Sequence, residues 1–348
     1  MRSTWLLAVA LACALPVRAQ GPSPATELLA RAERDRTADN PAFRATLKQL
    51  DTSAGQLTEK QRWHLRYLHA WQQDFSGDIA GAQRALREII AKAPDPLIRF
   101  RARTTLLNTL ALTRHYEDAY RELDLLMREM PLVRDVTARF QALGEAAQLM
   151  TAAGQYDLSI RYVDQMLAKL PPGEGVCRAR VHIEHARFRR SGLASSDPEL
   201  AEVIRICDAE GQPLFADYLR ADMAALFLAE GDAARAIALL REYLPEVKRA
   251  GYKRLVAQFK ALLAQALLAR QEWIAARETA LEAVDDGRGD GISEPLSIAY
   301  RVLYAEARER GGTTPQRWPG TRNTAKRSGR ISMTPARRRR PIRACTCA

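Results

Sequence analysis

The sequence lacks the local motifs that mark most nucleotide-binding proteins and hydrolases. It has no Gly-x-x-x-x-Gly-Lys-Ser/Thr loop, no Gly-x-Gly-x-x-Gly fingerprint, no Gly-x-Ser-x-Gly elbow and no His-Glu-x-x-His pair. It also lacks the alternation of apolar and polar residues that indicates β-strands. Only five cysteines occur in 348 residues, which excludes a small fold held together by disulfides. We therefore expect a non-catalytic chain that needs no cofactor.

Acidic residues are missing from both ends of the chain, and this absence accounts for the whole excess of positive charge. The net charge is +12. Residues 1–19 and 311–348 contain basic residues and no Asp or Glu, whereas residues 20–310 contain 41 basic and 41 acidic residues. A neutral body produces no long-range field that attracts polyanions. The charge pattern therefore argues against nucleic acid as a partner.

The longest apolar run lies at the N-terminus and is too short to span a membrane. It covers the eleven residues Trp5 to Leu15, behind Arg2, and Val17-Arg18-Ala19 fits the small-x-small rule for signal cleavage. We expect a signal peptide over residues 1–19, cleaved after Ala19, and no transmembrane helix in the mature chain. A lipoprotein cysteine at Cys13 is the competing interpretation. Either one predicts export to the periplasm, an oxidising compartment.

Residues 20–310 have the apolar period of α-helices, as at Leu255, Phe259, Leu262 and Ala266. Pro and Gly interrupt this period at short intervals, where helices end. We predict fifteen helices, at 24–36, 40–53, 58–74, 78–92, 96–113, 116–130, 134–152, 156–169, 175–191, 197–209, 213–229, 232–249, 251–269, 272–285 and 294–310.

Turns recur along this body at a regular spacing of 37 to 41 residues. The aligned turn positions are Gly77, Arg114, Gly154, Gly192, Gly231, Gln271 and Gly312. A small residue follows most turns, where two helices must approach closely: Ala82, Ala119, Ser159, Ala236 and Ala276. A proline often marks the end of the second helix: Pro94, Pro131, Pro171 and Pro245. This pattern predicts an all-α, right-handed helical solenoid, with N-terminal helices in 20–56 and repeats over 57–310.

The turns Gly154-Gln155-Tyr156-x-x-Ser159 and Gly231-Asp232-x-x-x-Ala236 resemble those of tetratricopeptide repeats, with longer helices than the standard unit. The turn at 191–198 departs from this pattern. The layout of signal peptide, short N-terminal helices and 37–41-residue repeats is similar to the periplasmic sensory region of bacterial membrane-bound diguanylate cyclases. In that family a transmembrane helix and a cytoplasmic GGDEF domain follow the repeats, and neither is recognisable in this sequence.

The resemblance implies a sensory module that binds a protein, a peptide or a small molecule in its concave groove, truncated before the membrane helix and the cyclase. The alternative is a stand-alone periplasmic scaffold for protein–protein interaction in envelope assembly. Residues 311–348 bear on this choice, because they contain ten basic residues, no acidic residue and no helical period. They are either a disordered basic tail or the product of a changed reading frame. We favour the changed frame, because one base earlier the codons permit an amphipathic helix that continues the repeat.

Aromatic residues at helical spacing form the first candidate site. Trp63, Tyr67 and Trp71 lie on one face of the helix predicted at 58–74. The first helix of each pair lines the concave surface of a solenoid, so these rings would anchor a peptide or small molecule there. Packing in the hydrophobic core is the competing interpretation.

Two further sets of residues bear on metal binding and on disulfide formation. His182 and His185 share one helical face, but no third ligand is apparent, so we expect no metal site. Cys177 begins one predicted helix and Cys207 nearly ends the next, and the ends of an antiparallel pair meet. In an oxidising compartment we expect these cysteines to form a disulfide, with two buried free thiols as the alternative.

Overall fold

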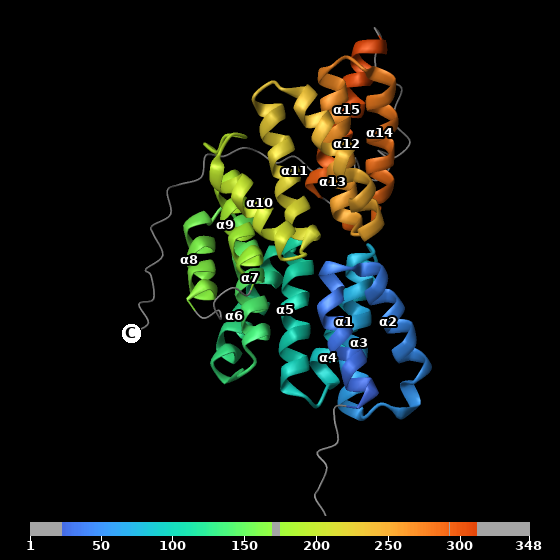
Figure 1. Cartoon of the computed structure of the whole chain (residues 1–348), viewed down its shortest axis with the longest axis vertical. Coiled ribbons are helices and arrows are strands. Elements are labelled where there is room, and N and C mark those ends of the chain that lie inside the picture. Colours follow the sequence, from blue (N-terminus) through green and yellow to red (C-terminus); the bar gives the residue numbers. More distant parts are fainter. Residues whose placement is uncertain (1–22, 169–174, 292, 312–348) are drawn as a thin grey trace, which may run out of the picture.

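The computed structural model describes residues 23–168, 175–291 and 293–311, and within these ranges the chain contains α-helices and no β-strand (Figure 1). The predicted signal peptide, Pro171 and the segment 312–348 lie outside the described residues. The helices of the described ranges are α1 (Pro24–Ala38), α2 (Asn40–Thr52), α3 (Glu59–Phe75), α4 (Ile79–Lys92), α5 (Pro96–Leu112), α6 (Tyr116–Glu129), α7 (Val136–Ala152), α8 (Tyr156–Leu167), α9 (Val176–Arg190), α10 (Pro198–Ala209), α11 (Pro213–Ala229), α12 (Ala233–Ala250), α13 (Lys253–Ala269), α14 (Trp273–Asp286) and α15 (Glu294–Gly311).

Each of these helices matches one predicted from the sequence, with both ends within two residues of the predicted bounds. Local signals explain this agreement. Aspartates cap several helices by accepting a hydrogen bond from a backbone N–H of the first turn, as Asp78, Asp135 and Asp232 do. One expectation is wrong: Pro245 does not end its helix but lies inside α12. Burial of the amphipathic face on the neighbouring helices outweighs the hydrogen bond that a proline removes.

The backbone confirms the alignment of the turns. The six aligned positions within the described ranges all have positive φ, from 62° at Arg114 and Gln271 to 92° at Gly77 and Gly192. Glycine adopts this conformation without strain, whereas Arg114 and Gln271 adopt it despite their Cβ atoms. The small residues predicted after the turns are fully buried, which allows each helix pair to pack closely: Ala82, Ala119, Ser159, Ala236 and Ala276.

Consecutive helices pack as antiparallel pairs along the whole described chain, and α1 and α2 form such a pair as well. The odd-numbered helices also contact one another in order, so they form an inner layer, while the even-numbered helices cover it from outside. The layer curls until its first helices reach the C-terminal half: α1 contacts α11, and α2 contacts α12 (Figure 1). The rings of Phe75 and Tyr252 are 4.8 Å apart at this junction. None of the described helices is both long and apolar enough to cross a bilayer.

Candidate functional site

Polar side chains of the inner helices gather in the interior of the superhelix. They repeat at three or four residues along each helix, which places them on one helical face. The set consists of Glu33 and Arg36 on α1, His64 and Tyr67 on α3, Arg101, Thr105 and Asn108 on α5, Gln141, Glu145 and Gln148 on α7, and Arg178, His182 and His185 on α9. Hydrogen bonds between these helices make the interior one continuous polar region.

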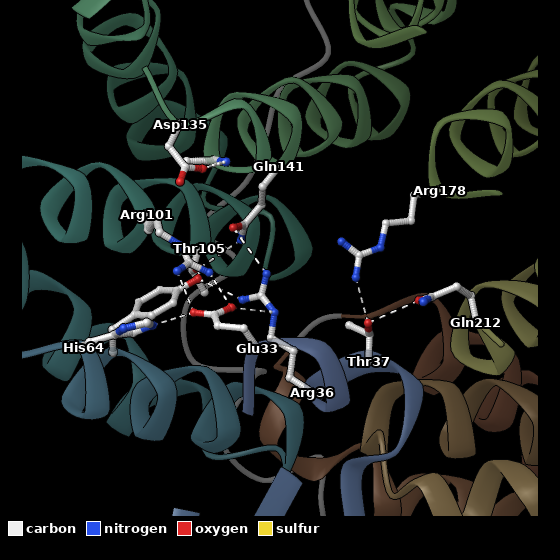
Figure 2. Close-up of polar contacts among 12 residues, drawn as sticks. Glu33, Arg36, Thr37, His64, Arg101, Thr105, Asp135, Gln141, Arg178 and Gln212 are labelled. Carbon is white, nitrogen blue, oxygen red and sulfur yellow. Dashed lines mark hydrogen bonds and ion pairs between the residues drawn. The ribbon is translucent and has the colours of Figure 1, made fainter. Parts of the chain in front are cut away.

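The first part of this region is the Glu33 cluster. It comprises Glu33, Arg36, His64 and Arg101, which are labelled in Figure 2, together with Tyr67. The two Nη atoms of Arg101 each lie 2.6 Å from a carboxylate oxygen of Glu33. His64 Nε2 is 2.6 Å from Glu33 Oε1, and Arg36 Nε is 3.5 Å from Oε2. Burial opposes ionisation of Glu33, but Arg36 and Arg101 hold its pKa well below the usual value. Glu33 is therefore a half-buried carboxylate whose charge is balanced within the chain.

Tyr67 belongs to this cluster and has no exposed surface. Its hydroxyl accepts a hydrogen bond from Arg36 Nη1 at 3.1 Å and lies 3.2 Å from Thr105 Oγ1. The guanidinium of Arg101 lies over its ring, 4.8 Å from the ring centre. The Tyr67 ring is thus enclosed by the chain's own residues.

The two tryptophans of the predicted aromatic face lie in different surroundings. Trp71 contacts the rings of Phe43 and Phe75 at 5.5 and 4.9 Å between ring centres. Phe75 in turn contacts Tyr252, which precedes α13, so Trp71 is connected to the aromatic contact between α3 and the C-terminal half of the chain. Trp63 is partly buried, with the guanidinium of Arg66 4.8 Å from its ring centre. The three rings do not form one surface, and ligand binding by them stays a prediction.

Glu145 and Arg178 occupy the middle of the interior, and the structure shows no ion pair between them. Burial raises the pKa of Glu145 to about 7, although the side-chain amide of Asn108 donates a hydrogen bond to it. Burial and the neighbouring charge of Arg36 lower the pKa of Arg178 to about 10. Arg178 Nη2 donates to Thr37 Oγ1 at 2.8 Å, which links α9 to α1 (Figure 2). Burial therefore disfavours the charged form of both groups, and a direct ion partner would offset this effect.

Beyond Gln148 the interior contains a cavity of about 200 Å³. The C-terminal ends of α5 and α7, the inner faces of α9, α11 and α13, and the start of α15 border it. His182 and His185 are among the lining residues. Burial lowers the pKa of His182 to about 4, so this imidazole is neutral near pH 7. Burial also opposes protonation of His185, but Asp222 Oδ2 lies 2.7 Å from its Nδ1 and raises its pKa.

The structure thus brings both predicted histidines to one cavity. In the described ranges, however, no three His, Cys, Asp or Glu side chains are grouped as a metal ion requires. Sequence reasoning missed Glu33 and Asp222. Charged residues on an amphipathic helix are ordinarily interpreted as its solvent-facing side, and no local signal reveals that these helices turn part of that side inward.

Cys177 and Cys207 are joined as a disulfide, with an S–S distance of 2.11 Å and a Cα–Cα distance of 4.8 Å. Cys177 lies in the first turn of α9, next to Arg178, and Cys207 lies in the last turn of α10. Both side chains are fully buried. The bond fixes the start of α9, the helix that supplies Arg178, His182 and His185 to the interior.

Comparison with known proteins identifies the fold of the chain but not a family. No family model matches the sequence, and a search of curated proteins gave no match. Among solved structures, a Rap protein complexed with competence and sporulation factor is similar, with a TM-score of 0.54 and 12% identity over 82% of this chain and 85% of that one. A signal-transduction ATPase with numerous domains and a tetratricopeptide-repeat sensor, from Pyrococcus horikoshii, has a TM-score of 0.49 and 13% identity over 82% of this chain and 45% of that one. The chain is a tetratricopeptide-like helical solenoid.

Proposed function

We propose that this chain is a non-catalytic sensory repeat domain that binds its signal inside the superhelix. The observation that carries the proposal is the cavity, bordered by five inner helices and the start of α15. One helical turn from its lining lie Glu145 on α7 and Arg178 on α9, for which the described residues show no ion pair. Concave sites with a few convergent polar groups are where proteins usually hold ligands. The similar Rap protein was solved with competence and sporulation factor, which favours the same use of this fold here.

A periplasmic location is part of the proposal. Two features support it: the apolar run behind Arg2 with a cleavage motif ending at Ala19, and the disulfide between Cys177 and Cys207. Disulfides persist in oxidising compartments and are rare in the cytosol. Cell fractionation tests this point: the full chain is expected in the periplasm, and a variant that starts at Gln20 is expected in the cytoplasm.

We further propose that the domain is the input module of a membrane-bound diguanylate cyclase, as the resemblance of its repeats implies. The contact of α1 with α11 and of α2 with α12 supports a mechanism. A ligand held between the inner helices would change the curvature of the solenoid and the spacing of its two ends, and a following membrane helix would transmit this change. Sequencing the gene through the codon for Arg310 and onward tests the link. A frame that encodes a membrane helix and a GGDEF domain supports it, whereas stops in every frame favour the scaffold alternative.

Binding in the interior can be tested by filling the cavity. Gln258 on α13 lines the cavity, is half-buried and shows no hydrogen bond to a described residue, so Gln258→Trp places an indole there with little other disturbance. Gln83→Trp is the matched control, because Gln83 is also half-buried but lies on the outer helix α4. A thermal-shift screen of peptides and metabolites should find ligands that stabilise the wild type and Gln83→Trp but not Gln258→Trp. Equal responses of all three proteins would refute binding in the interior.

A further inference from the structure

We propose that the cavity binds a small aromatic carboxylate, with the carboxylate at the N-terminus of α15 and the ring between α9 and α11. This inference rests on the proposed function, in which the interior holds the signal, and it names the chemical class of the ligand. Three features of the cavity carry it: the charge of its lining, an unsatisfied polar atom, and its size and apolar walls.

Positive charge predominates among the described residues that line the cavity. Arg114, Arg189 and Arg254 border it, whereas Glu294 is the one carboxylate of the lining. Glu294 already pairs with Arg189, at 2.6 Å between Oε2 and Nη1. Guanidinium groups bind carboxylates through charge-assisted hydrogen bonds, which are stronger where water is excluded. The lining therefore favours an anionic ligand over a neutral or cationic one.

The start of α15 supplies a second, independent feature. Ser293 precedes this helix, is 2% exposed and lines the cavity, and its Oγ has no hydrogen-bond partner among the described residues. A buried hydroxyl without a partner is costly, and a ligand oxygen would satisfy it. The same helix end carries the partial positive charge of its free N–H groups, which favours an anion. Arg254, 8% exposed, borders the same cavity and donates to the Leu112 carbonyl at 3.4 Å.

The volume and the apolar walls of the cavity set the rest of the ligand. A cavity of about 150 Å³ in another protein holds benzene, so the 200 Å³ here holds a ring and a carboxylate. Phe215 and Tyr218 on α11 and Val181 on α9 supply the walls. The Arg178 guanidinium lies 5.2 Å from the centre of the Phe215 ring, and the His185 ring lies 6.2 Å from that of Tyr218. A ligand ring would therefore pack edge-to-face or with an offset on the remaining surface of these two rings. In the Glu33 cluster, by contrast, Arg36, His64 and Arg101 all lie against the carboxylate of Glu33.

The test measures binding of benzoate, phenylacetate and 3-phenylpropionate to the full chain by calorimetry and thermal shift. Benzamide, phenylacetamide and 3-phenylpropionamide serve as the neutral counterparts of the three acids, and benzylamine as the cationic counterpart of benzoate. We expect at least one carboxylate to bind at least tenfold more tightly than its amide. Gln258→Trp should abolish this binding, and Gln83→Trp should retain it.

Ser293→Ala adds a change at the carboxylate end. It should weaken binding about three- to tenfold without lowering the melting temperature of the free protein, because it deletes a hydroxyl that has no partner among the described residues.

Binding of the carboxylates to Gln258→Trp with unchanged affinity would overturn the proposal, as would amides that bind as tightly as the acids. If no carboxylate binds but other library members stabilise the wild type and not Gln258→Trp, the inference fails while the proposed function stands. If nothing binds in a Gln258→Trp-sensitive way, both fail.

Discussion

In the Glu33 cluster a half-buried carboxylate meets the guanidinium groups of Arg101 and Arg36 at 2.6 and 3.5 Å. The cavity lining contains three arginines and one carboxylate, Glu294, which pairs with Arg189. The same inner layer of helices builds both regions. Helix α1 fills the first region with its own Glu33 and Arg36, whereas among the described helices only the start of α15 enters the second. The contrast supports the proposal that the first region stabilises the superhelix and that the second binds a ligand.

Glu33→Gln should give the largest effect, because it removes the counter-charge of Arg36 and Arg101 in a buried site. Breaking a buried ion pair from one side costs about 3–5 kcal/mol in the free energy of unfolding. Urea denaturation measures this loss. Glu117→Gln is the control, because the Glu117 side chain is 90% exposed and its pair with Arg121 should contribute less than about 1 kcal/mol. Equal losses in the two variants would remove the distinction between the regions.

Loss of the Cys177–Cys207 bond should have the next largest effect. The bond closes a loop with a sequence separation of 30, for which chain entropy gives about 3–4 kcal/mol. Thermal melts of residues 20–310 with and without reductant measure the difference. The Cys177→Ser/Cys207→Ser double variant should melt at the same temperature as the reduced wild type, and reductant should not change that temperature. Two titratable thiols in the unreduced protein, with identical melts, would contradict the disulfide.

Glu145 lies between the two regions and should make stability depend on pH. Its pKa is raised to about 7 in the folded state, so between about pH 4.5 and 7 the folded chain holds a proton that the unfolded chain releases. The contribution of Glu145 to stability therefore falls as the pH rises through this window. The free energy of unfolding of Glu145→Gln, relative to that of the wild type, should therefore rise by about 2–3 kcal/mol from pH 5 to pH 8. A gain that stays constant with pH would show that Glu145 ionises normally.

Arg114→Gly should have the smallest effect on stability and should separate stability from binding. Glycine adopts the positive φ of 62° at this turn without steric strain, so the free energy of unfolding should increase by about 0.5–1 kcal/mol. The same change deletes a cation of the cavity, so benzoate should bind more weakly. Gln271→Gly is the matched control, because Gln271 has the same φ but does not line the cavity, and it should gain stability with unchanged binding. Parallel effects on benzoate would contradict the role of Arg114.

The sequence by itself determined the helices, the turn positions and the cysteine pair that could bond, because each depends on signals close together in the chain. The apolar period, aspartate caps and residues at positive φ act within a few residues of one another, so they can be recognised without knowing the fold. Pro245 escaped this reasoning because packing along α12 outweighs the local preference of a proline. The local signals also placed Tyr67 on the inner face without showing what would surround it.

Only the tertiary structure decided which charges are buried and where the interior stays open. Arg36 donates a hydrogen bond to Gln141, which lies 105 residues further along the chain, and Thr37 donates one to Gln212, 175 residues further along. These contacts exist because the inner layer curls until α1 meets α11, and that curvature accumulates from small rotations between successive repeats. Glu33 and Arg101 have the same local surroundings in the sequence as charged residues on a solvent-facing helix. Their burial, and the cavity beyond Gln148, follow from the closure of the superhelix.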